Sequence, residues 1–141
     1  MSMANNVNNK IVSVDPERFK LDTANLENNV LIGYRCQTCN VYVFGPSTYC
    51  QSCSSRSMEE VEFSGTAILY SYTVIHVPPA GWPGRVPYVL GEAELAEGPH
   101  VLAELIDCEM NEIETGINLS LTYEFVQNNN NDIAVYKWRF N

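Results

Sequence analysis

The alternation of hydrophobic and polar residues predicts a chain built mainly from β-strands. The pattern is clearest over residues 117–123, where apolar and polar side chains alternate without a break, as in a half-buried strand. Other apolar segments in the second half of the chain are rich in β-branched and aromatic residues and are separated by turn residues. The strands expected there span residues 63–77, 88–95, 100–107, 117–123 and 133–140.

Five strands within so short a segment predict a small closed barrel. The first strand is long and begins near Gly65, and a glycine there suggests the bulge or sharp coil that barrels need at their corners. The connection over residues 108–116 is short and has room for one helical turn. Among small barrels the OB-fold fits this order best. An SH3-like barrel or an open sandwich would show a similar periodicity, so both remain alternatives.

The N-terminal half is expected to contain a short helix and a small ribbon. Asp15, Pro16 and Glu17 match a helix start: a capping residue, a proline at the first helical position and an acid in the first turn. The asparagine-rich stretch 25–29 would end this helix early. Residues 30–35 then predict a strand, and residues 41–44 predict the inner strand of the ribbon.

Four cysteines form two Cys-x-x-Cys pairs separated by ten residues, namely Cys36 with Cys39 and Cys50 with Cys53. Each such turn points both sulfurs the same way, so two turns can surround one Zn²⁺ with four thiolates at about 2.3 Å. The separation is shorter than is usual for this motif, which suits a compact, rubredoxin-like zinc ribbon. Rubredoxin-type iron and two disulfides are the alternatives.

A metal held by four thiolates has no open position for water or substrate. We therefore expect one structural zinc ion rather than a catalytic one. A ribbon of this size buries too little apolar surface to fold alone, so the metal would contribute much of its stability.

These elements divide the chain into three parts: a disordered tail over residues 1–14, a helix and zinc ribbon over 15–58, and an OB-fold over 59–141. No run of about 18 apolar residues is present, which excludes a membrane-spanning helix. The polar residues 1–9 lack the apolar core of a signal peptide, so we expect a cytoplasmic protein. In that compartment, paired cysteines favour a metal over disulfides.

The charge distribution argues against nucleic-acid binding. The chain has 17 acidic and 8 basic residues, and residues 59–126 contain twelve acids against a single arginine, Arg85. A protein that binds DNA or RNA needs lysine and arginine to neutralise phosphates. A nucleic-acid-binding ribbon and OB protein is therefore the less favoured alternative.

A few further side chains could carry chemistry of their own. Glu92 and Glu94 face the same side of one strand and could act as acid and base, although a solvated strand face explains them more simply. Cys108 ends an apolar strand and is better interpreted as a buried free thiol than as a nucleophile. An enzymatic role for the chain itself would depend on these three residues.

The two cysteine pairs are followed by the segment 65–76, which reads Gly-Thr-Ala-Ile-Leu-Tyr-Ser-Tyr-Thr-Val-Ile-His. In this order of elements the chain resembles the DUF35 family of zinc-ribbon/OB-fold proteins. Further matching pieces lie at 87–89, 94–99, 102–108 and 113–116, and the resemblance covers about residues 15–140. The chain departs from the family pattern at two positions. Asn40 stands where a glycine is usual, and His76 stands alone where a second histidine often follows.

This resemblance implies a non-catalytic accessory subunit that helps to assemble an acyl-CoA enzyme and to form its CoA site. The implied partner is a thiolase-like catalytic subunit in a hetero-oligomer, with coenzyme A or an acyl-CoA shared between the chains. Aldolases, HMG-CoA synthase and hot-dog-fold hydratases are the other partner classes that the family implies.

The proline-rich loop over residues 77–87 is the best candidate for contact with CoA or with the partner. Its prolines limit the entropy lost on ordering, and Trp82 offers a flat apolar surface. Arg85 can hold a phosphate or a carboxylate through two hydrogen bonds. We expect His76, Trp82, Arg85 and Tyr88 to make these contacts.

Overall fold

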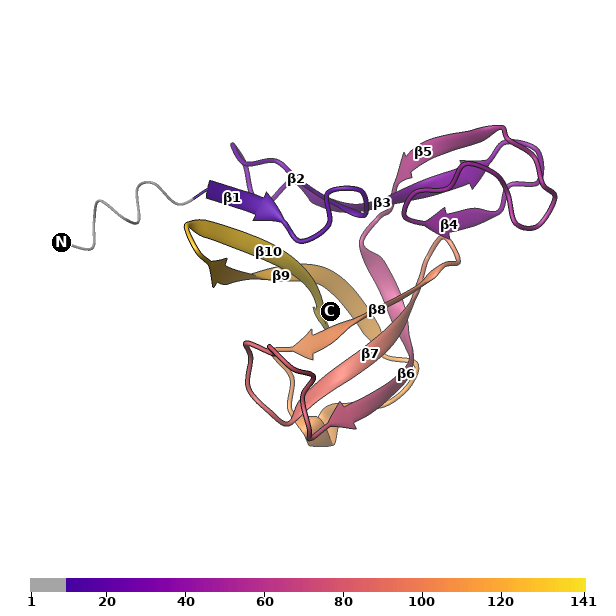
Figure 1. Cartoon of the computed structure of the whole chain (residues 1–141). Helices are drawn as coiled ribbons and strands as arrows, with labels where there is room; N and C mark the ends of the chain where they lie inside the picture. The colour runs from indigo at the N-terminus through magenta and orange to yellow at the C-terminus, as the bar shows by residue number, and fades with distance from the viewer. Residues whose placement is uncertain (1–9) are drawn as a thin grey trace.

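The computed structural model describes residues 10–141 as two connected β-sheets (Figure 1). The smaller sheet contains β2 (Phe19–Leu21), β3 (Asn29–Cys36), β4 (Tyr42–Phe44) and β5 (Met58–Glu62). The larger sheet contains β1 (Lys10–Ser13), β6 (Thr66–Ile75), β7 (Tyr88–Leu95), β8 (His100–Ile106), β9 (Asn118–Asn128) and β10 (Asn131–Phe140). A 3₁₀ turn, η1 (Met110–Glu112), lies in the connection before β9. Within this range no helix is long and apolar enough to cross a membrane.

The larger sheet closes on itself as a barrel. β6, β7 and β8 are antiparallel neighbours, and β10 pairs with β8 in parallel and with β9 in antiparallel register. β9 then pairs back with β6, which completes the ring of five strands. This closed arrangement confirms the OB-fold that the sequence predicts.

The inward-facing residues of each strand fill the barrel, as the period of two requires. The side chains that reach this core include Leu69, Ala93, Val101, Leu105, Leu119 and Trp138. Trp138 is fully buried, and its indole N–H donates a hydrogen bond to the carbonyl of Val101 at 3.3 Å. That bond satisfies the one polar atom of the largest buried side chain.

Aromatic side chains join the smaller sheet to the barrel. Phe19 of β2 is fully buried, and its ring centroid lies 5.6 Å from that of Tyr136 and 6.3 Å from that of Tyr123. Phe44 of β4 meets the same Tyr136 ring edge-on at 6.1 Å. The two sheets therefore share one hydrophobic core, which runs from the ribbon into the barrel.

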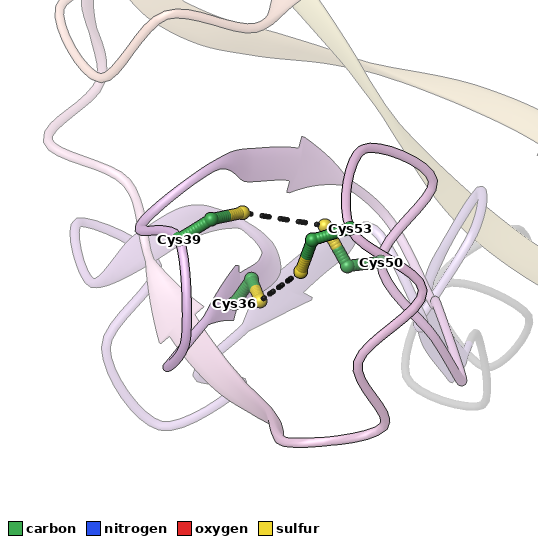
Figure 2. A group of neighbouring side chains, drawn as sticks. All are labelled: Cys36, Cys39, Cys50 and Cys53. Carbon is green, nitrogen blue, oxygen red and sulfur yellow. Dashed lines mark hydrogen bonds between the residues drawn. The ribbon is translucent and has the colours of Figure 1, made fainter.

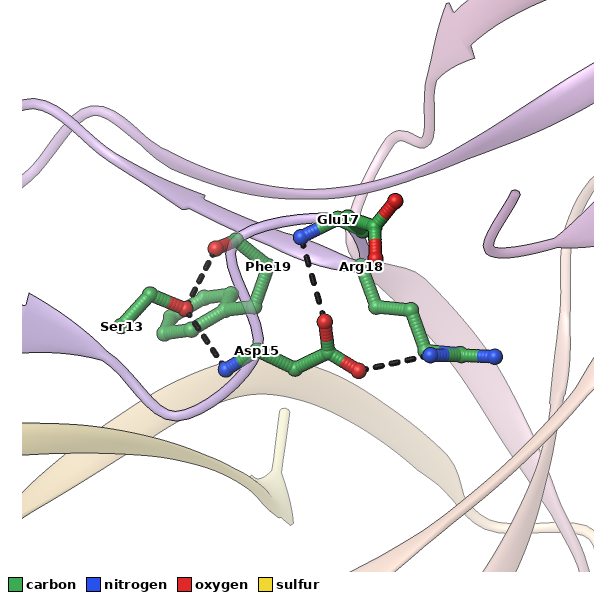
Figure 3. A network of polar contacts seen from close by, with 5 residues as sticks. All are labelled: Ser13, Asp15, Glu17, Arg18 and Phe19. Carbon is green, nitrogen blue, oxygen red and sulfur yellow. Dashed lines mark hydrogen bonds and ion pairs between the residues drawn. The ribbon is translucent and has the colours of Figure 1, made fainter.

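The predicted N-terminal helix is wrong, because a single turn leads directly into a strand (Figure 3). Asp15 does cap this turn: its carboxylate accepts a hydrogen bond from the Glu17 N–H at 3.1 Å and pairs with the Arg18 guanidinium at 2.6 Å. Ser13 Oγ donates to the carbonyl of Phe19 at 2.6 Å. The helix does not extend because Phe19–Leu21 pairs with β3 and buries the Phe19 ring.

The predicted N-terminal tail is also too long. Lys10–Ser13 forms β1, which pairs in parallel with the start of β10. The expected boundary at residue 14 is therefore wrong, and residues 1–9 lie outside the described part of the chain. Little in the sequence indicates this strand, because it is only four residues long and its partner lies more than a hundred residues further along the chain.

We expect Phe19→Ala to lower the free energy of unfolding by about 3–5 kcal/mol, because it removes the buried ring that joins the two sheets and leaves a cavity there. Urea unfolding of the metal-loaded protein measures this loss. Phe125→Ala is the matched control, since Phe125 is 43% exposed, and it should cost far less. Equal losses in the two variants would contradict a shared core centred on Phe19.

Candidate functional site

The four cysteines of the two Cys-x-x-Cys pairs meet at one end of the smaller sheet (Figure 2). Their sulfurs all lie within 4.8 Å of one another, with Cys36 3.6 Å from Cys53 and Cys39 3.5 Å from Cys50. Cys36 and Cys50 are buried, whereas Cys39 and Cys53 lie on the exposed side of the cluster. The structure thus brings together all four ligands that the sequence predicts.

The two knuckles have the same backbone geometry. In each, the residue after the second cysteine has a left-handed conformation, with φ of 67° at Asn40 and 65° at Ser54. The N–H of that residue donates to the carbonyl of the first cysteine, at 2.8 Å in both knuckles. Asparagine tolerates this conformation better than most residues, which explains how Asn40 replaces the usual glycine.

The four thiols differ in pKa. The backbone N–H of Cys39, with further hydrogen bonds, lowers the pKa of Cys36 to about 6. The N–H of Cys53 lowers the pKa of Cys50 in the same way. The Ser55 N–H acts to lower the pKa of Cys53, but burial and the neighbouring cysteines outweigh it and raise that pKa to about 12. Four thiolates this close need a cation between them, because their charges repel.

The cluster fits a tetrahedral metal. Four sulfurs at about 2.3 Å from Zn²⁺ would lie about 3.8 Å from one another, close to the 3.6 Å of Cys36–Cys53 and the 3.5 Å of Cys39–Cys50. All four cysteines are free thiols, so two disulfides do not describe this arrangement. An all-thiolate tetrahedral set suits zinc or iron. It leaves no position open for a reacting group.

A second feature is a cleft of about 730 Å³ between the proline-rich loop and the β9–β10 hairpin. Its walls are mostly apolar and include Trp82, Phe125, Val126 and Val135. Arg85 lies at the loop side of the cleft and Glu124 at the hairpin side. None of the residues that line the cleft is a cysteine or belongs to a strand of the smaller sheet.

Two of the four residues predicted to bind CoA or a partner line this cleft, namely Trp82 and Arg85. Tyr88 is buried and stacks on the Trp82 ring at 4.1 Å, so it supports the wall from behind. His76 is exposed at the end of β6, outside the residues that line the cleft. Whether these residues bind CoA or a protein stays a prediction.

Sequence reasoning missed a buried ion pair in the cleft. Lys137 of β10 and Glu104 of β8 lie 2.6 Å apart, and each side chain is only 9% exposed. The Lys137 ammonium also sits 5.4 Å from the centre of the Trp82 ring. Aromatic and basic residues alternate over 136–140, but the pairing joins positions 33 residues apart. No local signal could reveal it.

The residues that an enzymatic role would need are poorly suited to it. Burial, with nearby Asp107 and other acids, raises the pKa of the Cys108 thiol, which is the reverse of an activated nucleophile. Glu92 accepts hydrogen bonds from Ser71 at 2.9 Å and contacts the His100 ring at 2.6 Å. The contact with His100 is the main cause of its lowered pKa.

The fold and the cluster together define a two-part protein, a four-cysteine ribbon on an OB-fold barrel. Residues 60–124 match the model of the C-terminal OB-fold domain of ChsH2. The chain is 33% identical over 111 residues to a DUF35 domain-containing scaffold protein of Pyrococcus furiosus, covering 78% of this chain and 81% of that protein. This chain belongs to the DUF35 family.

Two further similarities connect the family to named enzymes. The chain is 27% identical over 110 residues to benzoylsuccinyl-CoA thiolase subunit BbsA of Geobacter metallireducens, covering 78% of this chain and 73% of that subunit. A solved structure titled "Ltp2-ChsH2(DUF35) aldolase" superposes with a TM-score of 0.64 and 30% identity. That match covers 79% of this chain and 84% of the solved one.

We expect Cys50→Ser to lose the metal and to unfold the ribbon, because three thiolates no longer complete the tetrahedral set. Elemental analysis of the purified variant measures the loss, and amide hydrogen exchange over residues 29–62 measures the unfolding. Cys108→Ser removes a thiol outside the cluster and should keep its metal. Wild-type metal content in Cys50→Ser would refute the site.

We expect Glu104→Gln to destabilise the protein by about 3–5 kcal/mol, because it leaves the Lys137 ammonium buried without its counter-charge. Removing both charges, as Glu104→Gln with Lys137→Met, should recover much of the loss. Glu124→Gln, an exposed acid of the same cleft, serves as control in the same urea titration. A double variant as unstable as Glu104→Gln alone would contradict the pairing.

Proposed function

We propose that this chain is a non-catalytic accessory subunit of an enzyme complex that acts on acyl-CoA thioesters. The family relationship is the observation that carries this proposal. Similar proteins are named as a scaffold, a thiolase subunit and part of an aldolase. The role assigned to the chain is to hold the complex together and to help shape its CoA site. The catalytic residues would belong to the partner.

A thiolase-type catalytic subunit is the proposed partner, in a hetero-oligomer with this chain. The similarity to BbsA supports this choice, and it makes thiolytic cleavage of benzoylsuccinyl-CoA the first reaction to test. An aldolase-type or hydratase-type partner is the second candidate, and the superposition on the Ltp2–ChsH2 aldolase favours the aldolase. The chain would act in the cytoplasm, where its paired cysteines stay reduced.

The proposed metal is a single structural zinc ion, held by Cys36, Cys39, Cys50 and Cys53. Zinc bound there would supply folding free energy to the ribbon and no chemistry to a substrate, since the four thiolates fill its coordination sphere. The proposed domain division places the ribbon before residue 59 and the OB-fold after it; β5 of the smaller sheet continues to Glu62, and β1 joins the larger sheet.

Trp82 and Arg85 are proposed to contact CoA or the partner at the mouth of the cleft, with Tyr88 holding the indole in place. His76, at the start of the same loop, is proposed to contact the partner. Lys137 is already neutralised by Glu104, so Arg85 is the one unpaired cation that the cleft residues offer. One arginine cannot balance the phosphates of CoA. The partner would have to provide the remaining cations.

A tagged copy purified from the native cells should bring down a thiolase-like, aldolase-like or hydratase-like subunit in a fixed ratio. Elemental analysis of the eluate should give about one zinc per chain, because four thiolates bind one ion. The Cys50→Ser variant should recover no partner. Recovery of zinc-loaded wild-type chain without any acyl-CoA enzyme would overturn the proposed function.

A further inference from the structure

The outer surface of the barrel carries a second feature, on the strands β6, β7 and β8. We name it the β6–β8 face, and it consists of Ile68, Tyr70, Glu92, Glu94, His100 and Leu102. The register brings them together: Ile68 pairs with Glu94 and Glu94 with His100. In the next row Ser71 pairs with Glu92, and Glu92 pairs with Leu102.

Three large apolar side chains on this face point into solvent. Ile68 is 46% exposed, Tyr70 58% and Leu102 59%. No element in the described part of the chain covers them, because the ribbon packs against Tyr123 and Tyr136 of β9 and β10 instead. Leaving three such side chains together in water is unfavourable, and a group of this kind is typical of a binding surface.

The face is also held in a fixed shape. A β-bulge between Leu69 and Ser71 displaces Tyr70, and its ring packs against the His100 ring at 4.6 Å. His100 Nδ1 lies 2.6 Å from a Glu92 oxygen, and Ser71 Oγ donates to the other oxygen of Glu92. A tyrosine fixed in this way loses little entropy when a partner covers it. Tyrosine is also among the residues that dominate binding energy at interfaces.

The charge of the face selects the kind of partner. Glu92 and Glu94 lie between the apolar residues, and the chain has no lysine or arginine from residue 59 to 126 except Arg85, which lines the cleft. A second copy would bring the same acids opposite these, with a net charge of −9 on each chain. Like charges at an interface are repulsive, so self-association through this face is disfavoured.

We propose that the β6–β8 face docks a different protein, whose contact surface has an apolar centre bordered by lysine and arginine. This inference rests on the proposed function, because the partner it describes is the catalytic subunit of the acyl-CoA complex. None of the six residues of the face lines the cleft, although Glu104 of the cleft follows Leu102 by two positions on the same side of β8, so docking here would leave Trp82 and Arg85 available. The face supplies attachment, and the cleft supplies contact with the ligand.

The test measures the dissociation constant between this chain and the catalytic subunit recovered with it. Tyr70→Ala should weaken binding by about 30-fold or more, as expected for a central tyrosine. Leu102→Lys should weaken it by at least about tenfold, because it replaces an apolar contact with a like charge. Met110→Lys, at a residue 45% exposed outside the face, should bind as the wild type does.

A further pair of variants tests the contribution of the acidic residues to binding. Glu94→Lys should weaken binding more than Glu114→Lys, an exposed acid in the loop before β9, and the difference should shrink at high salt. Thermal unfolding of each variant confirms that these surface changes leave the fold intact.

The outcomes separate the two proposals. Wild-type affinity of Tyr70→Ala and Leu102→Lys for a recovered acyl-CoA enzyme would overturn the docking surface and leave the proposed function standing. Recovery of no acyl-CoA enzyme would overturn the proposed function, and the inference with it. A dimer of the isolated chain that Leu102→Lys dissociates would place a second copy on the face and would also overturn the inference.

Discussion

The convergence of four cysteine sulfurs within 4.8 Å is the constraint on which the N-terminal half depends. β4 is only three residues long, and the two knuckles each require a left-handed residue, Asn40 or Ser54. Such short elements bury little apolar surface, so they cannot offset the entropy of ordering this segment. A metal that binds only the folded knuckles would supply the missing free energy and hold their shape.

The ribbon in turn determines which side of the β9–β10 hairpin is buried and which side stays exposed. Phe19 and Phe44 cover Tyr136, so one side of the β9–β10 hairpin is buried by the smaller sheet. The other side carries Val126 and Val135 and opens into the cleft under Trp82. An accessory subunit needs surfaces of this kind, one for its own assembly and others for a ligand and a partner. In the function we propose, the metal stabilises the ribbon, the cleft contacts the ligand and the β6–β8 face docks the partner.

Features with a local signal were predictable from the sequence. The cysteine spacing located the cluster, and alternation together with β-branched and aromatic segments between turn residues located all five barrel strands, because these signals lie within a few residues. Features that depend on distant contacts were not. Asp15 caps a turn just as it would cap a helix, and only the pairing of Phe19 with Leu31 decides between them. β1 and the Lys137–Glu104 pair likewise depend on partners far along the chain.

We propose that the chain enables a reaction that it does not perform. The test measures turnover of CoA thioesters, beginning with benzoylsuccinyl-CoA. It compares the chain alone, the recovered catalytic subunit alone and the reconstituted pair. We expect no turnover by the chain, and full turnover only when the catalytic subunit is combined with the zinc-loaded chain. Turnover by the chain alone that is lost in Cys108→Ala or Glu94→Gln would contradict it.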